Sequence, residues 1–146
     1  MQVITSKDNE IIKNIRKLKE KKYRDLNNVF LVEGIKMIRE AISENAVIDK
    51  IVVCEDNIND GGLDKKLLYE IAKYDCISVN KKLFSQITDV QNPQGILAII
   101  QKRNSEEDID YKQDIIVVLD GIQDPGNLGT ILRTIDSVRI KSSYSI

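Results

Sequence analysis

Hydrophobic residues in the first hundred positions follow two spacings, one typical of helices and one typical of strands. Isoleucine and leucine recur at helical intervals between Lys7 and Lys22, which predicts an amphipathic helix capped by Ser6. Further strands are predicted at 30–32, 47–53, 77–79 and 95–100. Further helices are predicted at 35–42, 63–73 and 81–86, with a polar loop at 55–62. Strands that alternate with helices in this way predict a compact α/β domain.

The pattern changes after the first hundred residues. Residues 103–113, RNSEEDIDYKQ, are polar, acidic and aperiodic, which is typical of a linker. The continuous apolar run DIIVVL at 114–119 then predicts a strand buried on both faces of a parallel sheet. A helix is predicted from about Leu128 onwards. The chain is therefore expected to begin a second sheet beyond the linker.

A turn, DPGN, joins that strand to the helix at residues 124–127. Pro125 fixes φ, Gly126 is expected to take the positive φ of a type II turn, and Asn127 is expected to cap the helix. Loops at the carboxyl ends of parallel strands often bind ligands, and helix amino ends favour anions. The pattern matches neither GxxxxGK[ST] nor GxGxxG, which disfavours the nucleotide-binding loops of those kinds. DPGN is also a good turn without any ligand, so spacing alone leaves both interpretations open.

Composition narrows the class of protein and its chemistry. The chain has 146 residues, of which 42% are hydrophobic and 31% charged, and this composition predicts a soluble globular protein. It has no apolar run near the roughly 20 residues of a membrane span and no secretion signal, so a cytoplasmic location is expected. The absence of histidine and of CxxC spacing predicts no metal site and excludes histidine-activated nucleophiles. Cys54 and Cys76 are predicted to be buried free thiols.

Charge is distributed unevenly along the chain. The net charge is only -1, but residues 1–24 hold eight Lys or Arg against three Asp or Glu. Such a basic region attracts phosphate backbones, although from charge alone it can equally be a solvated helix face. Tyr23 has two interpretations, stacking on an unpaired base or packing in the fold. The candidate RNA-binding residues are Lys7, Lys13, Arg16, Lys17, Lys21, Lys22 and Arg24.

Residues 119–134, LDGIQDPGNLGTILRT, closely resemble the first signature motif of the SpoU/TrmH family. These are RNA ribose 2′-O-methyltransferases of the knotted SPOUT class. The specific positions of the motif are matched by Asn127, Leu128, Gly129, Arg133 and Thr134. The segments KKYR at 21–24, FLVEG at 30–34 and QNPQG at 91–95 resemble the substrate-binding domain that precedes the catalytic domain in many of these enzymes. That domain is similar in fold to ribosomal proteins that bind kinked RNA.

The resemblance implies a domain organisation and a set of partners. It places an RNA substrate-binding α/β domain at 1–104, a linker at 105–113 and an incomplete SPOUT domain, an α/β knot, at 114–146. It implies RNA as the partner, ribosomal or transfer RNA, with ribosomal RNA favoured, and no membrane. Intact relatives dimerise through the knot of the C-terminal domain, which leaves the oligomeric state of this chain open.

The resemblance also implies S-adenosylmethionine as the cofactor of the intact enzyme. Its pocket is built from two later motifs that this chain lacks, so this chain is not expected to bind the cofactor or to methylate alone. The apolar faces of residues 114–119 and of the following helix would then lack neighbours. We therefore expect the last 35 or so residues to pack differently from those of an intact family member.

Site roles follow from the same motif. The resemblance assigns Arg133 to the ribose 2′-hydroxyl or its adjacent phosphate, and Asn127 to hydrogen bonds at the same site. Because arginine remains protonated in proteins, Arg133 is better suited to orient the phosphate and stabilise an oxyanion than to act as a base. Two functions are thus expected: a truncated RNA 2′-O-methyltransferase or, as the alternative, a stand-alone RNA-binding module with a vestigial C-terminal segment.

Overall fold

A computed structural model describes residues 1–102, 112, 114–140 and 142–145. The chain divides into two compact units, residues 1–103 and 104–146. The predicted linker at 105–113 lies outside the described residues except for Lys112. None of the helices in the described ranges is long and apolar enough to cross a membrane.

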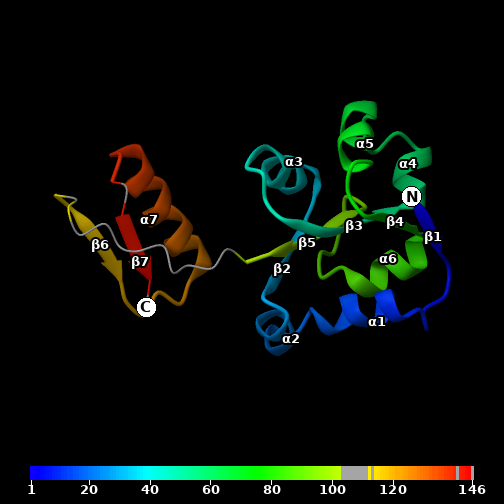
Figure 1. Ribbon diagram of the computed structural model, residues 1–146, viewed down its shortest axis with the longest axis horizontal. Helices are drawn as coiled ribbons and strands as arrows, with labels where there is room; N and C mark the ends of the chain where they lie inside the picture. The colour runs from blue at the N-terminus through cyan, green and yellow to red at the C-terminus, as the bar shows by residue number, and fades with distance from the viewer. Residues whose placement is uncertain (103–111, 113, 141, 146) are drawn as a thin grey trace. The chain divides into compact units, whose positions relative to one another are not determined.

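The N-terminal unit is built on a five-stranded sheet of order β1-β4-β3-β5-β2 (Figure 1). Strands β1, β4 and β3 are parallel, whereas β5 runs antiparallel to both β3 and β2. The strands are β1 Gln2–Ile4, β2 Val29–Glu33, β3 Ile48–Cys54, β4 Cys76–Val79 and β5 Ile96–Gln101. The four predicted strands and the α/β class are confirmed. Strand β1 was missed because it has three residues, of which only Ile4 is buried.

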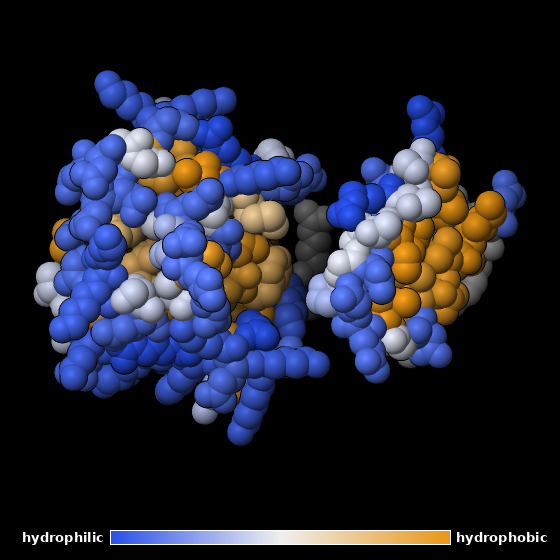
Figure 2. Space-filling model, turned by 180° about the vertical axis from the view of Figure 1, so that it is seen from behind, coloured by the Kyte–Doolittle hydropathy of each residue, from blue (hydrophilic) through white to orange (hydrophobic). Residues whose placement is uncertain are grey.

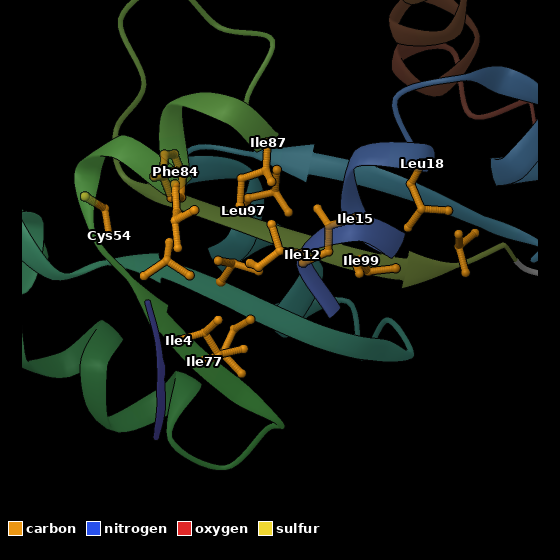
Figure 3. Close-up of a cluster of buried hydrophobic side chains, with 14 residues drawn as sticks. Ile4, Ile12, Ile15, Leu18, Cys54, Ile77, Phe84, Ile87, Leu97 and Ile99 are labelled. Atoms are coloured by element: carbon orange, nitrogen blue, oxygen red, sulfur yellow. The ribbon is translucent and has the colours of Figure 1, made fainter. Parts of the chain in front are cut away.

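Helices cover both faces of this sheet. They are α1 Glu10–Lys17, α2 Lys21–Leu26, α3 Ile35–Ser43, α4 Glu55–Asn59, α5 Lys65–Ile71 and α6 Lys81–Ile87. Helices α1 and α6 lie on one face, and α3 and α5 lie on the other (Figure 1). Along β3, Val52 and Cys54 join the core under α1 and α6, while Ile51 and Val53 join the core under α3 and α5. Figure 3 shows the first of these two cores. A strand buried on both faces explains why it reads as a continuous apolar run.

The predicted helix at 7–22 is wrong in its extent, because it is two helices. The side chain of Asn9, not that of Ser6, caps α1 by accepting from the backbone N–H of Ile11 at 2.9 Å. The hydroxyl oxygen of Ser6 instead accepts from the backbone N–H of Asp8 at 3.2 Å. The predicted loop at 55–62 is also wrong in part, since its first five residues form α4 directly after β3.

The C-terminal unit is a parallel β-α-β arrangement. Strand β6, Ile116–Leu119, pairs in parallel with β7, Ser142–Ser145, and α7, Pro125–Ser137, connects them. The side chain of Asp124 caps α7 by accepting from the backbone N–H of Asn127 at 2.8 Å. Proline at the first helical position is common, because its fixed φ suits a helix and its missing N–H would be unpaired there. The helix therefore begins earlier than predicted. The expectations that Asn127 caps it and that Gly126 has a positive φ are wrong.

That this unit packs differently from that of an intact family member stays a prediction. The end of the chain forms a regular strand in parallel register with β6, from Ile116 opposite Ser142 to Leu119 opposite Ser145. The prediction that the 114–119 run is buried on both faces is wrong, since Ile115 is 58% and Val118 57% exposed. On the face seen in Figure 2, hydrophobic surface gathers on this unit. Among the described residues, two strands and one helix cover only part of this apolar strand.

Candidate nucleic-acid interface

Besides Lys13, four lysines of the basic front, residues 1–24, are exposed on or beside α1 and α2: Lys7, Lys17, Lys21 and Lys22. In the part of the chain that the structure describes, none of them forms an ion pair. The ammonium of Lys22 lies 5.9 Å from the centre of the Tyr23 ring, a cation–π contact that leaves the charge at the surface. These side chains are therefore available to an anion such as a phosphate, as predicted for a basic surface.

Lys13 is already paired within α1. Its ammonium lies 2.9 Å from a carboxylate oxygen of Glu10, one turn earlier. The hydrogen bond to Lys13 lowers the pKa of Glu10, and the same bond raises the pKa of Lys13. Both side chains are at the surface, where such a pair is weak and screened by salt. A phosphate can therefore compete with Glu10 for this ammonium.

Arg24 has a structural task at the end of α1. Its guanidinium Nη1 donates to the backbone carbonyl of Leu18 at 2.9 Å and to that of Lys19. These carbonyls follow the last turn of α1, where a helix has no internal donors and the dipole favours a cation. Arg24 therefore stabilises the junction of α1 and α2. Its predicted contact with RNA stays a prediction.

Arg16 differs from the other basic residues of the front. Its guanidinium atoms Nε and Nη2 are buried and have no hydrogen-bond partner among the described residues. Helical spacing places Arg16 immediately after buried Ile15 and four residues after buried Ile12, at the margin of the core face. A buried donor without a partner destabilises the fold, more so when it is charged. Sequence reasoning treated Arg16 as one member of a surface patch and missed this burial.

A polar cluster that the sequence did not indicate ties α1 to the loop after α6. The ammonium of Lys19 donates to the backbone carbonyl of Thr88 at 2.8 Å and lies 3.0 Å from the carboxylate of Asp89. The hydroxyl of Thr88 donates to the carboxylate of Glu33, with oxygen–oxygen distances of 2.6 and 2.7 Å. Burial raises the pKa of Glu33. No sequence signal could have found this cluster, because its members are far apart along the chain.

Two motifs that were separate in the sequence meet at the start of β5. The side-chain oxygen of Gln94 accepts from the backbone N–H of Ile35 at 2.8 Å, and the N–H of Gly34 donates to the carbonyl of Ile96 at 3.0 Å. Gly95 has a φ of 73°, and a Cβ atom there would lie 2.1 Å from the side-chain oxygen of Asn57. The structure therefore brings FLVEG and QNPQG together and requires glycine at position 95.

Beside these motifs opens a pocket of about 530 Å³ near the carboxyl end of β3. Its walls include Cys54, Asp56, Asp60 and Lys81. Cys54 and Cys76 are buried free thiols, which confirms that prediction, and burial raises the pKa of Cys76 to about 11. Two carboxylates on the walls make this pocket less suited to a polyanion than the basic front.

The predicted catalytic residues lie on α7, in the C-terminal unit. Arg133 is exposed, and its Nη2 donates to the hydroxyl of Thr130 at 3.2 Å, which turns the guanidinium toward the amino end of the helix. The guanidinium lies beside Gly129, where a Cβ atom would be 3.4 Å from Arg133 Nη1, an ordinary contact distance. Asn127 is exposed in the first turn. Within the described residues no hydrogen bond joins Asn127 to Arg133, and their catalytic roles stay predictions.

Comparison with known proteins identifies the N-terminal unit. Residues 9–98 match the family model of the MRM3-like substrate binding domain. The 23S rRNA (guanosine(2553)-2'-O)-methyltransferase RlmP of Bacillus subtilis is 31% identical over 137 residues, which are 94% of this chain and 51% of that protein. The mitochondrial rRNA methyltransferase 3 of Xenopus laevis is 29% identical over 133 residues, which are 86% of this chain and 30% of that protein.

Solved structures agree with these relatives. The AdoMet-bound rRNA methyltransferase from Sinorhizobium meliloti matches with a TM-score of 0.75 and 30% identity, covering 99% of this chain and 54% of that one. The chain thus spans about half the length of this enzyme and of its Bacillus relative. The resemblance to SpoU/TrmH rRNA methyltransferases is confirmed. Because the family model spans more than half of the chain, the protein belongs to the family of MRM3-like substrate-binding domains.

Proposed function

We propose that this chain is the RNA-binding part of a ribosomal RNA 2′-O-ribose methyltransferase. The observation that carries the proposal is the coincidence of two features in the N-terminal unit. Residues 9–98 match a substrate-binding domain of rRNA methyltransferases, and the same residues carry the exposed lysines of α1 and α2. Ammonium groups at a surface bind phosphates without reading the sequence, so they supply affinity and position the RNA.

The C-terminal unit contributes polar groups suited to a ribose and its phosphate. Arg133 offers several N–H donors on a planar guanidinium, which suits it to hold a phosphate or a developing oxyanion. Asn127 offers an amide in the same exposed part of α7. In the whole enzyme these groups would orient the 2′-hydroxyl toward its methyl donor, and orientation of this kind lowers a barrier substantially.

S-adenosylmethionine, as the methyl donor of the whole enzyme, supplies a methyl group on a sulfonium. The described residues of this unit fit it poorly, because Ile115 and Val118 are more than half exposed and line an open surface. We therefore propose that this chain does not retain the cofactor and does not methylate alone. Isothermal titration of the chain with S-adenosylmethionine is expected to show no heat of binding, and micromolar affinity would contradict this.

A stand-alone RNA-binding module is the second candidate. One observation favours it: the family-model match at 9–98 lies entirely within the N-terminal unit. Both candidates require RNA binding, and only the first requires Arg133 and Asn127. When the segments found in longer relatives are supplied, the first candidate predicts methylation that Arg133→Ala abolishes. The second candidate predicts RNA binding without methylation, which Arg133→Ala leaves unchanged.

RNA binding itself is tested by its dependence on salt. The affinity for a structured ribosomal RNA fragment is expected to fall steeply between about 50 and about 200 mM salt, measured by fluorescence anisotropy. Replacing Lys17, Lys21 and Lys22 by glutamine should reduce the slope of log affinity against log salt by about 2 to 3. The matched control replaces Lys65, Lys66 and Lys73 on or beside α5. Equal losses in the two triple variants, or no binding at low salt, would contradict the proposal.

A further inference from the structure

A second pocket, of about 310 Å³, opens within the basic front itself. It lies where the end of α1 and the helix α2 meet β2, β3 and β5, and Figure 1 shows α1 and α2 on the same side of the unit. Its walls combine apolar, aromatic, amide and charged side chains. Those that carry the argument are Asn14, Lys17, Leu18, Tyr23, Asn27 and Ile99.

One part of the wall is apolar and aromatic. Leu18 and Ile99 are buried members of the core, and Tyr23 is half-buried and packed against the same core. Tyr23 is thus held by packing and also lines the pocket. An aromatic ring held in this way can stack on the face of a nucleobase at little cost in side-chain entropy.

The other part of the wall offers hydrogen-bonding groups that the fold does not use. The amide of Asn14 is exposed and makes no side-chain hydrogen bond to any residue that the structure describes. Asn27 donates from Nδ2 to the carbonyl of Tyr23 at 2.7 Å, which leaves its Oδ1 as an acceptor. Lys17 adds an exposed ammonium without an ion-pair partner among the described residues.

Two further charged groups of the wall, Lys50 and Asp49, have partners in the fold. Lys50 pairs with Asp75, and Asp49 accepts a hydrogen bond from the side chain of Gln101 at 2.6 Å. Asp49 keeps its negative charge, so the wall carries one carboxylate beside the ammonium of Lys17. The larger pocket at the carboxyl end of β3 has two carboxylates on its walls, Asp56 and Asp60, and is less suited to a nucleotide.

We propose that this pocket receives one unpaired nucleobase of the bound RNA. The base stacks on Tyr23, its edge is reached by the amides of Asn14 and Asn27, and its phosphate contacts Lys17. Sequence-specific binding of RNA depends on such splayed bases, because the major groove of an RNA duplex is too narrow for side chains. The inference rests on the proposed RNA binding and deepens it: the domain selects unpaired nucleotides and does not only attract phosphates.

The test compares two tyrosines and two forms of RNA. The probes are a fluorescein-labelled single-stranded RNA of about 12 nucleotides and the duplex of the same sequence. Tyr23→Leu keeps the apolar contacts of the side chain and removes the aromatic face. It should weaken binding of the single strand by about tenfold and change binding of the duplex by less than about twofold. The matched control is Tyr69→Leu, since Tyr69 is 70% exposed and also has a nearby lysine, Lys73, at 5.0 Å.

A second variant keeps the test valid if Tyr23→Leu disturbs packing. Asn14→Ala removes an exposed amide that the fold does not use, and it should weaken single-strand binding severalfold while the melting temperature stays unchanged. An equal loss for both forms of RNA, or no loss in either pocket variant, would overturn the pocket proposal. If the wild-type chain binds neither RNA, the proposed function fails instead, so the two failures are distinguishable.

Discussion

Both units of this chain contain apolar strands, but these strands are buried in the N-terminal unit and partly exposed in the C-terminal unit. In the N-terminal unit, β3 and β5 have helices over both faces of the sheet, and Ile51, Val52 and Ile96 are fully buried. In the C-terminal unit, β6 belongs to a two-stranded sheet, and Leu119 and Ile135 are the buried hydrophobic residues among its described positions. An apolar strand is stabilised by what covers it, so the same kind of sequence gives a closed core in one unit and an open surface in the other.

The difference also separates the tasks of the two units. The N-terminal unit buries its apolar residues within itself and presents lysines, an arrangement suited to a polyanion. The C-terminal unit presents exposed apolar side chains at Ile115, Val118 and Leu132. Exposed apolar surface of this kind is typical of an interface with further protein. The first unit is thus self-sufficient in its core, whereas the second is suited to a larger assembly.

Substitutions that create a cavity should show the largest difference between the packing of the two units. Ile51→Ala removes a fully buried side chain between the sheet and α5, and it should cost about 2 to 5 kcal/mol of the stability of the N-terminal unit. Ile135→Ala in α7 should cost less, because Ile135 is buried but belongs to neither of the two core clusters. Hydrogen exchange of each unit's own amides measures the two losses separately. Equal losses would mean that the C-terminal unit is as closely packed as the other.

Substituting two glycines that have nearly the same φ distinguishes the cost of a steric clash from the cost of backbone strain. Gly95 and Gly61 have φ values of 73° and 72°, but a Cβ atom would meet Asn57 at Gly95 and nothing within 4 Å at Gly61. Gly61→Ala should therefore cost about 1 kcal/mol, whereas Gly95→Ala should cost about 2 to 4 kcal/mol. Urea denaturation measures both costs, and Asn57→Gly should reduce the cost of Gly95→Ala. Identical costs at the two positions would contradict the tight contact.

A substitution of Arg16 tests whether this residue lowers the stability of the N-terminal unit while it contributes to RNA binding. Arg16→Met removes a buried charge that lacks partners among the described residues, so it should raise the stability of the free protein by about 1 kcal/mol. It should also weaken RNA binding if the guanidinium turns outward to a phosphate. Thermal melting and anisotropy with the same RNA measure the two effects. If Arg16→Met instead lowers the stability of the protein by a similar amount, the guanidinium has hydrogen-bond partners in the fold.

The smallest expected effect concerns Glu33 and pH. Burial raises the pKa of this carboxyl above its ordinary value of 4.5, although the hydroxyl of Thr88 donates to it. A carboxyl with a raised folded-state pKa contributes stability below its ordinary pKa, and that contribution is lost as pH rises through the raised value. The stability difference between wild type and Glu33→Gln should therefore shift in favour of the variant between about pH 4 and about pH 7. If the stability difference between wild type and Glu33→Gln does not depend on pH, the pKa of Glu33 is not raised.

Much of the fold could be predicted from periodicity. The four strands at the centre of the N-terminal unit and the helices at 35–42, 63–73 and 81–86 are found close to their predicted positions. Their signal is strong because residues such as Ile38, Leu67 and Phe84 point into a core. The split between α1 and α2 was not predictable, since the carbonyls at the end of α1 are bound by Arg24 from the next helix. A hydrophobic period cannot show such a polar contact.

The candidate site could be predicted only in part. Clustering of charge in residues 1–24 indicated a basic surface, and Lys7, Lys17, Lys21 and Lys22 are exposed as expected. The different situations of Arg16 and Arg24 depend on neighbours in three dimensions. The start of α7 was misjudged because both Asp124 and Asn127 are good caps in sequence, and Pro125 at the first helical position decides for Asp124. The pocket beside Tyr23 has no sequence signal, because its walls come from five separate elements.

Lysine footprinting tests most directly whether the basic front is the RNA-binding surface. The chain is acetylated with and without a saturating structured ribosomal RNA, and the modification of each lysine is measured by mass spectrometry. The account predicts protection of Lys17, Lys21 and Lys22, while Lys65 and Lys66 on α5 react equally in both samples. Protection confined to the α5 lysines, or bound RNA that protects none of the front lysines, would contradict it.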